Sequence, residues 1–285
     1  MINSPSSRAN KKDQVAYAKL FSVLLKKLNE GLYGSKKLND AISDYNKVIS
    51  NGEFTSPYRI QEEFENASKK MLDETEKTTA PKMSSAFFPA LAKRNQEKWM
   101  RSMRSQGGVK LAVKVEKATS KNAKKELAIR LGDNTSRINA WSKDHYSAFQ
   151  NSMTEAIRMA ENTGVPINTK AIAEKAIKDG SVPPNKRSKN RAALIARDQT
   201  SKFNAAVSRG RSRDLGSSYY QWNDSSDGRV RKLHLKFDQL YFNLEGKEVT
   251  RKGILVPGGI NTNGIMPGDE VNCRCFARWV INFKS

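Results

Sequence analysis

The sequence predicts an α+β protein: a mostly helical N-terminal region, then a small α+β domain with a long helix and a short antiparallel sheet. Two observations carry this prediction. Apolar residues recur at helical spacing through the first 165 or so residues, and aromatic, β-prone segments with Gly-rich turns replace that pattern after Gly216. We therefore expect the 285 residues to form two domains, residues 1–165 and residues 166–285.

The N-terminal helices are predicted from stripes of apolar residues. Stripes at residues 20–28, 38–49 and 57–71 indicate three helices, and a fourth starts at Ile138 and stops near Gly164. Residues 109–115 alternate apolar and other side chains, so this segment fits either a strand or a helix.

The C-terminal domain is predicted to begin with helices and to end with strands. A short helix is expected over residues 170–178, and a long basic helix runs from Asn190 to about Arg213 before Gly216. The segments 219–222 and 275–281 have the aromatic and β-branched composition of strands.

Positive charge is the strongest signal in the composition. The chain carries 51 Lys and Arg against 29 Asp and Glu, a net charge of +22, and its mean hydropathy is −0.70. Such a chain attracts polyanions, although the charge could also serve only to keep the protein solvated. Two runs that flank the long basic helix suit contacts to DNA phosphates without base reading. The residues concerned are Lys186, Arg187, Lys189, Arg191, Arg209, Arg211 and Arg213.

One histidine and the two cysteines form the sharpest potential site. His234 follows a basic run, and Cys273 and Cys275 share a C-x-C spacing near the end of the chain. These are three good zinc ligands, and Asp198, Asp224 or Asp227 could supply a fourth. A C-x-C pair differs from the usual C-x-x-C knuckle, so the alternative of two buried thiols is favoured and no bound cofactor is expected.

Arg229 and Arg231 allow two interpretations. On a strand they would project to one face as a clamp for phosphate or carboxylate, or they could form internal ion pairs with Asp224 and Asp227. No nucleophile accompanies His234 as a general acid or base, and His145 lies on an apolar helical stripe. The sequence contains no phosphate-binding loop, nucleophile elbow or zinc-protease motif. We therefore expect a protein that is not an enzyme.

The sequence shows no segment that would direct the chain to a membrane. Its N-terminus is polar and basic, and the longest apolar runs are far too short to span a bilayer. Two cysteines do not make a disulfide framework. We expect a protein made and kept in a reducing cytoplasm.

An ordered series of residues resembles the phage Mu protein F-like family of phage minor head proteins. The series is Ala196–Thr200, Asn204, Tyr220, Trp222, Asp227, Arg229-Val230-Arg231, His234, Pro267-Gly268 and Asn272-Cys273-Arg274-Cys275. The resemblance covers roughly residues 170–280. It departs from the family where Phe237-Asp238-Gln239 stands in place of a glycine turn.

The resemblance implies a minor head protein that acts in procapsid assembly at the portal vertex. Its implied partners are the portal protein, other head proteins and double-stranded DNA bound without sequence preference, with residues 1–165 binding the protein partners. It would be found in the virion, and in the host cytoplasm during assembly. Some family members resemble, or are fused to, small toxin-like domains, which leaves as the alternative a nuclease or other nucleic-acid-acting enzyme using His234 with Arg229 and Arg231.

Overall fold

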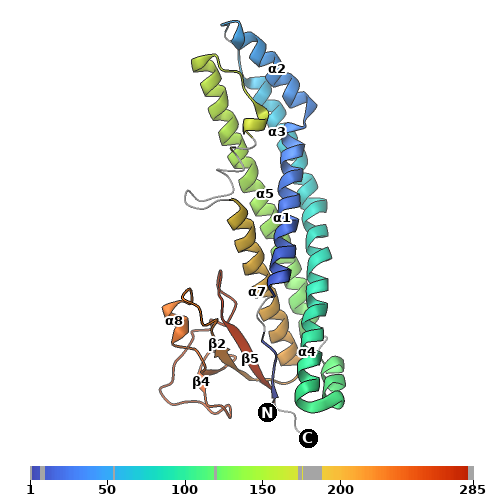
Figure 1. Cartoon of the computed structure of the whole chain (residues 1–285), viewed down its shortest axis with the longest axis vertical. Helices are drawn as coiled ribbons and strands as arrows, with labels where there is room; N and C mark the ends of the chain where they lie inside the picture. The colour runs from blue at the N-terminus through green and yellow to red at the C-terminus, as the bar shows by residue number, and fades with distance from the viewer. Residues whose placement is uncertain are drawn as a thin grey trace. The chain divides into compact units, whose positions relative to one another are not determined.

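The computed structural model describes residues 2–6, 10–53, 55–118, 121–172, 175 and 188–281. It confirms a helix-rich α+β protein with a small antiparallel sheet formed mainly by the C-terminal third (Figure 1). The helices are α1 (Lys11–Tyr33), α2 (Lys36–Ser50), α3 (Tyr58–Glu74), the π-helix η1 (Thr75–Thr79), α4 (Ala80–Ala118), α5 (Lys121–Thr163), α7 (Ser188–Asp214) and α8 (Lys232–Leu235). The strands are β1 (Ile2–Asn3), β2 (Tyr219–Asn223), β3 (Tyr241–Asn243), β4 (Glu248–Val249) and β5 (Phe276–Ile281).

Most predicted helices are present, and several are longer than their apolar stripes. The helix expected from Ile138 is the second half of α5, which begins at Lys121. Residues 109–115 are helical, as the last part of α4. The backbone of α4 leaves helical geometry once, at Gly108, where φ is 76° and ψ is −175°. The helix expected at 170–178 begins at residue 169, and most of its second half lies outside the described residues.

The chain divides into two compact units, each assembled from separate segments. Unit 1 contains residues 1–17, 85–132 and 194–285, and unit 2 contains residues 18–84 and 133–193. The units do not follow the expected boundary at residues 165 and 166. The reason is that α1, α4, α5 and α7 are long enough to contribute residues to both units.

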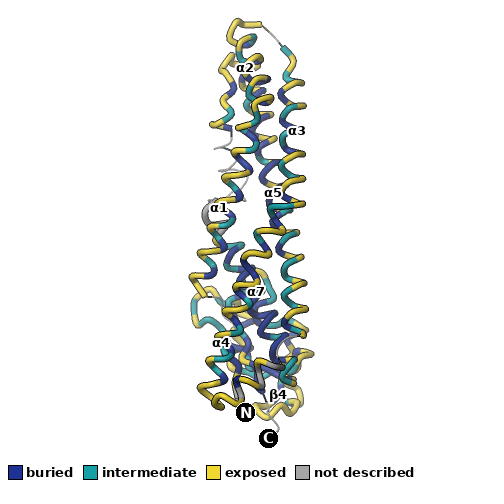
Figure 2. The backbone as a smooth tube through the Cα atoms, turned by 90° about the vertical axis from the view of Figure 1, so that its right-hand side faces the viewer, coloured by how far each residue is buried: buried dark blue, intermediate teal, exposed yellow. Residues whose placement is uncertain are grey.

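Unit 2 is a helical bundle with an aromatic core. Phe64 of α3 stacks on Phe149 of α5 with ring centroids 5.4 Å apart, and Phe21 of α1 meets Trp141 edge-on at 5.4 Å. His145 is buried in this core, as its apolar stripe indicates, and its Nε2 lies 2.8 Å from Oδ1 of Asn29. Buried and exposed positions alternate along α3 and α5 in Figure 2, the pattern of amphipathic helices.

Unit 1 contains the sheet, whose strand order is β1-β5-β2-β3-β4 with every neighbouring pair antiparallel. In the central pair, Tyr220 lies opposite Trp279 and Asn223 lies opposite Phe276. The N-terminal strand β1 pairs with the end of β5, Asn3 opposite Val280. The first and last described strands therefore close the same edge of the sheet.

Within unit 1, α4 packs on α7 through both apolar and polar contacts. Phe88 of α4 contacts Phe203 of α7 with ring centroids 4.8 Å apart. Asn95 of α4 donates to Oδ1 of Asn204 at 3.2 Å and accepts a hydrogen bond from Nε of Arg211 at 3.1 Å. These partners are all buried, so α4 is a structural part of the domain that contains the C-terminal residues. None of the described helices has an apolar stretch of the length needed to cross a membrane.

Candidate functional site

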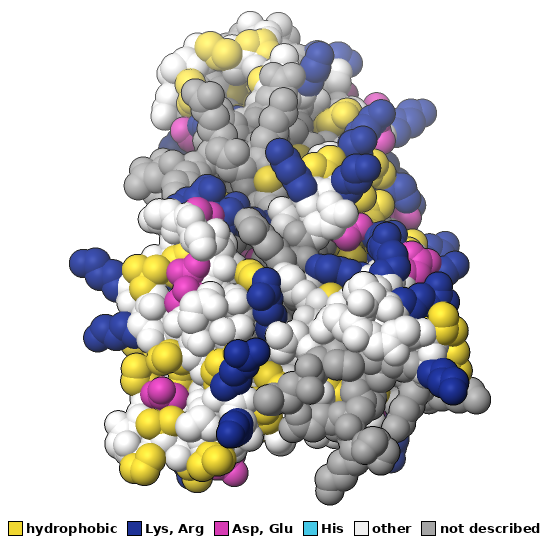
Figure 3. Space-filling model, turned by 60° about the horizontal axis from the view of Figure 1, so that its bottom comes forward, with side chains coloured by type: hydrophobic (Ala, Val, Ile, Leu, Met, Phe, Trp, Pro, Cys, Tyr) yellow, Lys and Arg dark blue, Asp and Glu magenta, His cyan; other side chains and the backbone are white. Residues whose placement is uncertain are grey.

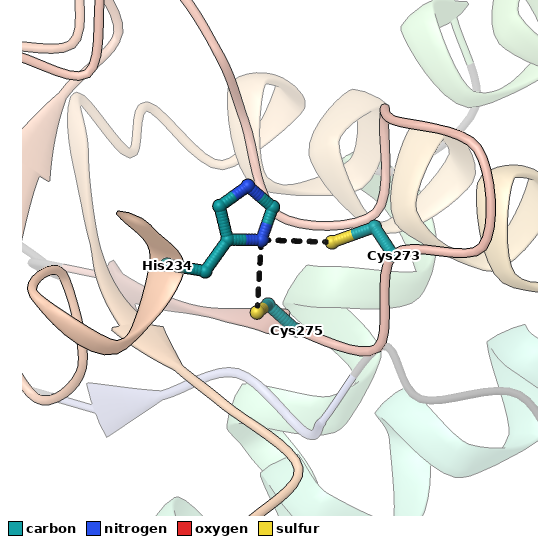
Figure 4. A group of neighbouring side chains, drawn as sticks. All are labelled: His234, Cys273 and Cys275. Carbon is teal, nitrogen blue, oxygen red and sulfur yellow. Dashed lines mark hydrogen bonds between the residues drawn. The ribbon is translucent and has the colours of Figure 1, made fainter. Parts of the chain in front are cut away.

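His234, Cys273 and Cys275 converge in unit 1 (Figure 4). Nδ1 of His234 lies 3.7 Å from Sγ of Cys273 and 3.5 Å from Sγ of Cys275. The three potential ligand atoms all lie within 4.8 Å of one another, and His234 is only 1% exposed. Both cysteines are free and buried, as the favoured interpretation holds. Their sulfur atoms nevertheless both face the same ring nitrogen.

Local backbone geometry brings the three side chains together. The short helix α8 carries His234, and a turn with Asn272 at φ 56° lies between the Pro-Gly segment and Cys273. Gly268 has φ 90°, and a Cβ at this position would lie 2.8 Å from the Cβ of Ala205. Only glycine fits there without strain, and its N–H donates to Sγ of Cys273 at 3.4 Å. Cys275 directly precedes β5.

A carboxylate and a guanidinium stand on the other side of the histidine ring. Nε2 of His234 lies 2.8 Å from Oε2 of Glu270, too far off the N–H direction for a regular hydrogen bond. Arg231 donates to the same Oε2 at 3.0 Å and to the carbonyl oxygen of Val271 at 2.8 Å. Glu270 is therefore fixed beside Nε2, while Nδ1 faces the sulfur atoms. The sequence did not identify Glu270, because nothing in the spacing shows which acid of this loop turns toward the ring.

Proton affinities in the site favour one thiolate. Hydrogen bonds from the Cys275 thiol, His234 and the Gly268 N–H lower the pKa of Cys273 well below its ordinary value, against the opposing effect of burial. The hydrogen bond that Cys275 donates to Cys273, together with burial, raises the pKa of Cys275. The hydrogen bond with Cys273 raises the pKa of His234. Chemically, the group can hold a thiolate–imidazolium pair or act as a tripod of metal ligands.

Aromatic side chains enclose this group. The indole of Trp222 meets the His234 ring edge-on with centroids 5.2 Å apart, and Phe237 stacks beside the imidazole at 6.2 Å. Both cysteines belong to the same apolar cluster as these two aromatic residues. Trp222, Phe237 and the C-x-C segment therefore share one buried core, with His234 packed against it.

The three aspartates considered as a fourth ligand are engaged elsewhere. Asp198 pairs with Lys202 at 3.1 Å and accepts the N–H of Asn272 at 2.7 Å, which fixes the turn before Cys273. Asp224 accepts a hydrogen bond from the N–H of Ser226 at 2.6 Å. Asp227 pairs with Arg274. Among the described residues, none of these carboxylates joins the group of His234 and the cysteines.

Arg229 and Arg231 form internal ion pairs, one of the two interpretations from the sequence. They lie in the turn before α8 and not on a strand, so they do not share a strand face. Arg229 approaches Asp227 at 3.8 Å, and Arg231 pairs with Glu270 instead of the predicted aspartates. With His234 buried and both guanidinium groups paired, the arrangement gives the nuclease alternative no support.

The arginines predicted to bind DNA do not form one surface. Arg211 is buried with its guanidinium bonded to Asn95, so its assignment as a phosphate contact is wrong. Arg209 pairs with Asp269 at 3.1 Å and is mostly covered, whereas Arg213 is exposed. Lys186 and Arg187 lie outside the described residues. Lys189 and Arg191 belong to the first turn of α7.

A basic surface instead follows α4 and the start of α5 in unit 1. The exposed side chains are Lys93, Arg101, Arg104, Lys110, Lys121, Lys124 and Lys125. Glu97 and Glu116 are the exposed acids between them. Lys and Arg side chains outnumber Asp and Glu on the face shown in Figure 3. This set, called the α4–α5 basic surface below, offers the exposed positive charge that binding to a polyanion requires. Arg209 and Arg211 of α7 do not, because one is paired and mostly covered and the other is buried.

Comparison with known proteins supports the family resemblance and extends it over more of the chain. The family model of phage Mu protein F like proteins matches residues 94–278, more than half of the chain and more than the expected 170–280. An uncharacterized protein of Haemophilus influenzae is 26% identical over 141 residues, which are 50% of this chain and 29% of that protein. The chain thus spans less than a third of that relative's length, and no solved structure matches significantly. The chain therefore belongs to the phage Mu protein F like family, a family of phage head morphogenesis proteins.

Proposed function

We propose that this protein is a minor head protein that acts in procapsid assembly at the portal vertex and binds the backbone of double-stranded DNA without sequence preference. The α4–α5 basic surface is the observation that carries the DNA-binding part of the proposal. Exposed Lys and Arg side chains attract phosphates and release condensed counterions when they bind. The described residues belong to none of the DNA-reading motifs that fit a helix or a zinc finger into the major groove.

The position of the basic surface supports this assignment. Arg101, Arg104 and Lys110 lie on α4, and Lys124 and Lys125 follow on α5, all within the segment that the family model matches. None of these five side chains forms an ion pair with another described residue. Their charge is therefore available to a polyanion, in contrast to that of Arg209.

Protein partners are assigned to unit 2, whose segment 18–84 precedes the family match and whose segment 133–193 lies within it. Several of its large apolar side chains are exposed, among them Val23, Tyr58 and Met159. Exposed apolar side chains are common singly, so the family's role in the head supplies the main reason to expect the portal protein as a partner. Co-purification of the full chain with portal protein tests this part of the proposal.

The DNA-binding part is tested by measuring affinity for two unrelated duplexes of equal length over a range of salt concentrations. We expect equal affinities and a linear fall of log K with log salt. Combining Arg104→Gln, Lys110→Gln, Lys124→Gln and Lys125→Gln should reduce the slope by about 0.9 for each phosphate that the variant no longer neutralises. Fluorescence anisotropy provides both affinity and slope.

A matched variant distinguishes the effect of this surface on DNA binding from the effect of total charge. Lys27, Lys36, Lys37 and Lys70 are exposed lysines of unit 2. Replacing all four with Gln lowers the net charge by the same amount and should leave most of the salt slope intact. Equal reductions in the two quadruple variants, or a strong preference for one duplex at high salt, would contradict the proposal.

A further inference from the structure

The geometry around Nδ1 of His234 matches the edges of a zinc tetrahedron. With Zn–S near 2.3 Å and Zn–N near 2.0–2.1 Å, a nitrogen and a sulfur ligand lie roughly 3.6 Å apart. The two observed separations are 3.7 Å to Cys273 and 3.5 Å to Cys275. Without an ion, the one proton of Cys275 is donated to Cys273 and cannot also be donated to Nδ1, although Sγ of Cys275 lies 3.5 Å from that nitrogen. A shared ion satisfies all three atoms at once.

We propose that His234, Cys273 and Cys275 bind one zinc ion through Nδ1 and two thiolates. This goes beyond the proposed role in the head and does not depend on it. Because no fourth His, Cys, Asp or Glu of the described residues joins the group, a water completes the tetrahedron. Two thiolates balance the charge of the ion, so the loaded site is neutral in its apolar surroundings.

Residues around the group have the placement expected of outer contacts to a metal site. Zinc-bound histidines commonly present their second ring nitrogen to a carboxylate, which fixes the orientation of the ring. Glu270 stands 2.8 Å from Nε2, although off the N–H direction, and Arg231 holds that carboxylate at 3.0 Å. The N–H of Gly268 donates to Sγ of Cys273, which stabilises a bound thiolate.

The ion would join parts of unit 1 that are distant in sequence. His234 on α8 is 39 residues from Cys273 and 41 residues from Cys275. Between them lie two short strands and the Gly-rich turns, segments with little regular structure of their own. A metal that binds only the folded arrangement stabilises it by its binding free energy. The bound ion would therefore stabilise the fold at the start of β5.

Metal content of the full-length chain tests the proposal. Protein reduced, incubated with zinc and then desalted should retain one zinc per chain by elemental analysis. Cobalt in place of zinc should give tetrahedral d–d absorption and a thiolate-to-cobalt charge-transfer band. The variants Cys273→Ser, Cys275→Ser and His234→Gln should lose the ion. His145→Gln, which alters the other histidine, should retain one zinc.

A pair of neighbouring acids sharpens the test and avoids variants that fail to fold. Glu270→Gln should weaken zinc affinity tenfold to a hundredfold and keep full occupancy at saturating zinc. Asp269→Asn, which changes the carboxylate paired with Arg209, should leave affinity unchanged. In the unaltered chain, zinc should protect both thiols from alkylation until a chelator is added. Substoichiometric zinc in that chain, or a cobalt spectrum without the thiolate band, would overturn the proposal.

Discussion

His145 provides a pH-dependent test at the level of one residue. Burial lowers its pKa from the ordinary 6.5 to about 4. Its Nε2 contacts Asn29, and its Nδ1 has no hydrogen-bond partner among the described residues, which offer no acceptor for a second ring proton. Between these two pKa values the unfolded chain binds a proton that the folded chain does not. The contribution of His145 to the free energy of unfolding is therefore fully present above pH 6.5. It decreases as pH falls toward 4, and the loss is about 2 kcal/mol at pH 5.

Urea unfolding at pH 7.5 and pH 5 measures this decrease. In His145→Gln the amide can still bond to Asn29 but does not titrate, so the difference between the two pH values should shrink by most of that amount. The comparison also removes contributions common to both proteins, such as that of His234. An unchanged pH dependence in the variant would show that His145 takes up its proton in the folded state.

The candidate site shows how far residue types alone define chemistry. His234, Cys273 and Cys275 could be singled out because the chain has two histidines and two cysteines, and both cysteines fall in one motif. Glu270 could not, because its approach to Nε2 depends on the turn conformation at Asn272. Arg211 was misassigned for a related reason: a basic run does not show which side chain points into a helix interface.

At the level of an element, the break in α4 depends on a glycine. Gly108 has φ 76° and ψ −175°, a region that other residues occupy only at a cost of about 1–3 kcal/mol. Gly132 lies within α5 in unit 1, and apart from neighbouring backbone no atom of the described residues stands within 4 Å of an added Cβ at either glycine. Gly108→Ala should lower the free energy of unfolding by that cost. Gly132→Ala should raise it by about 0.5–1 kcal/mol, since alanine favours a helix.

Urea midpoints of the two alanine variants provide the comparison. Each variant adds one methyl group in open space, so side-chain packing is the same for both and only the backbone conformation distinguishes them. Opposite signs are expected. A stabilising effect at Gly108 would mean that the backbone there is helical in solution and that α4 continues without a break.

The presence of the helices was predictable in this chain, and their length was not. The stripes at residues 20–28, 38–49 and 57–71 coincide with observed helices, the last to within one residue. The reason is that a buried helix face requires apolar residues at a regular spacing. Residues such as Pro89 and Gly132 normally weaken helices, yet both lie inside long ones. Packing of α4 and α5 against other elements outweighs these local costs of about 1–3 kcal/mol. Local sequence therefore underestimates helices that tertiary contacts extend.

At the scale of the whole molecule, unit 1 draws on three separate segments of the chain. Trp99 and Met103 of α4 share a buried cluster with Ile281 of β5, and Phe88 contacts Phe203. A boundary at residue 165 places these partners in different domains. Composition reports where strands replace helices, whereas a domain is defined by the surfaces that its elements bury together.

This arrangement predicts how fragments of the protein behave. Residues 166–285 alone lack Phe88, Trp99 and Met103, and each buried side chain of this size is worth about 1.5–3 kcal/mol. Their combined removal is comparable with the whole stability of an ordinary domain, about 5–15 kcal/mol. We therefore expect no cooperative thermal transition for this fragment by circular dichroism. Residues 85–285 retain residues 85–132 beside 194–285 and should unfold cooperatively, and a similar melting temperature for both fragments would show that α4 is dispensable.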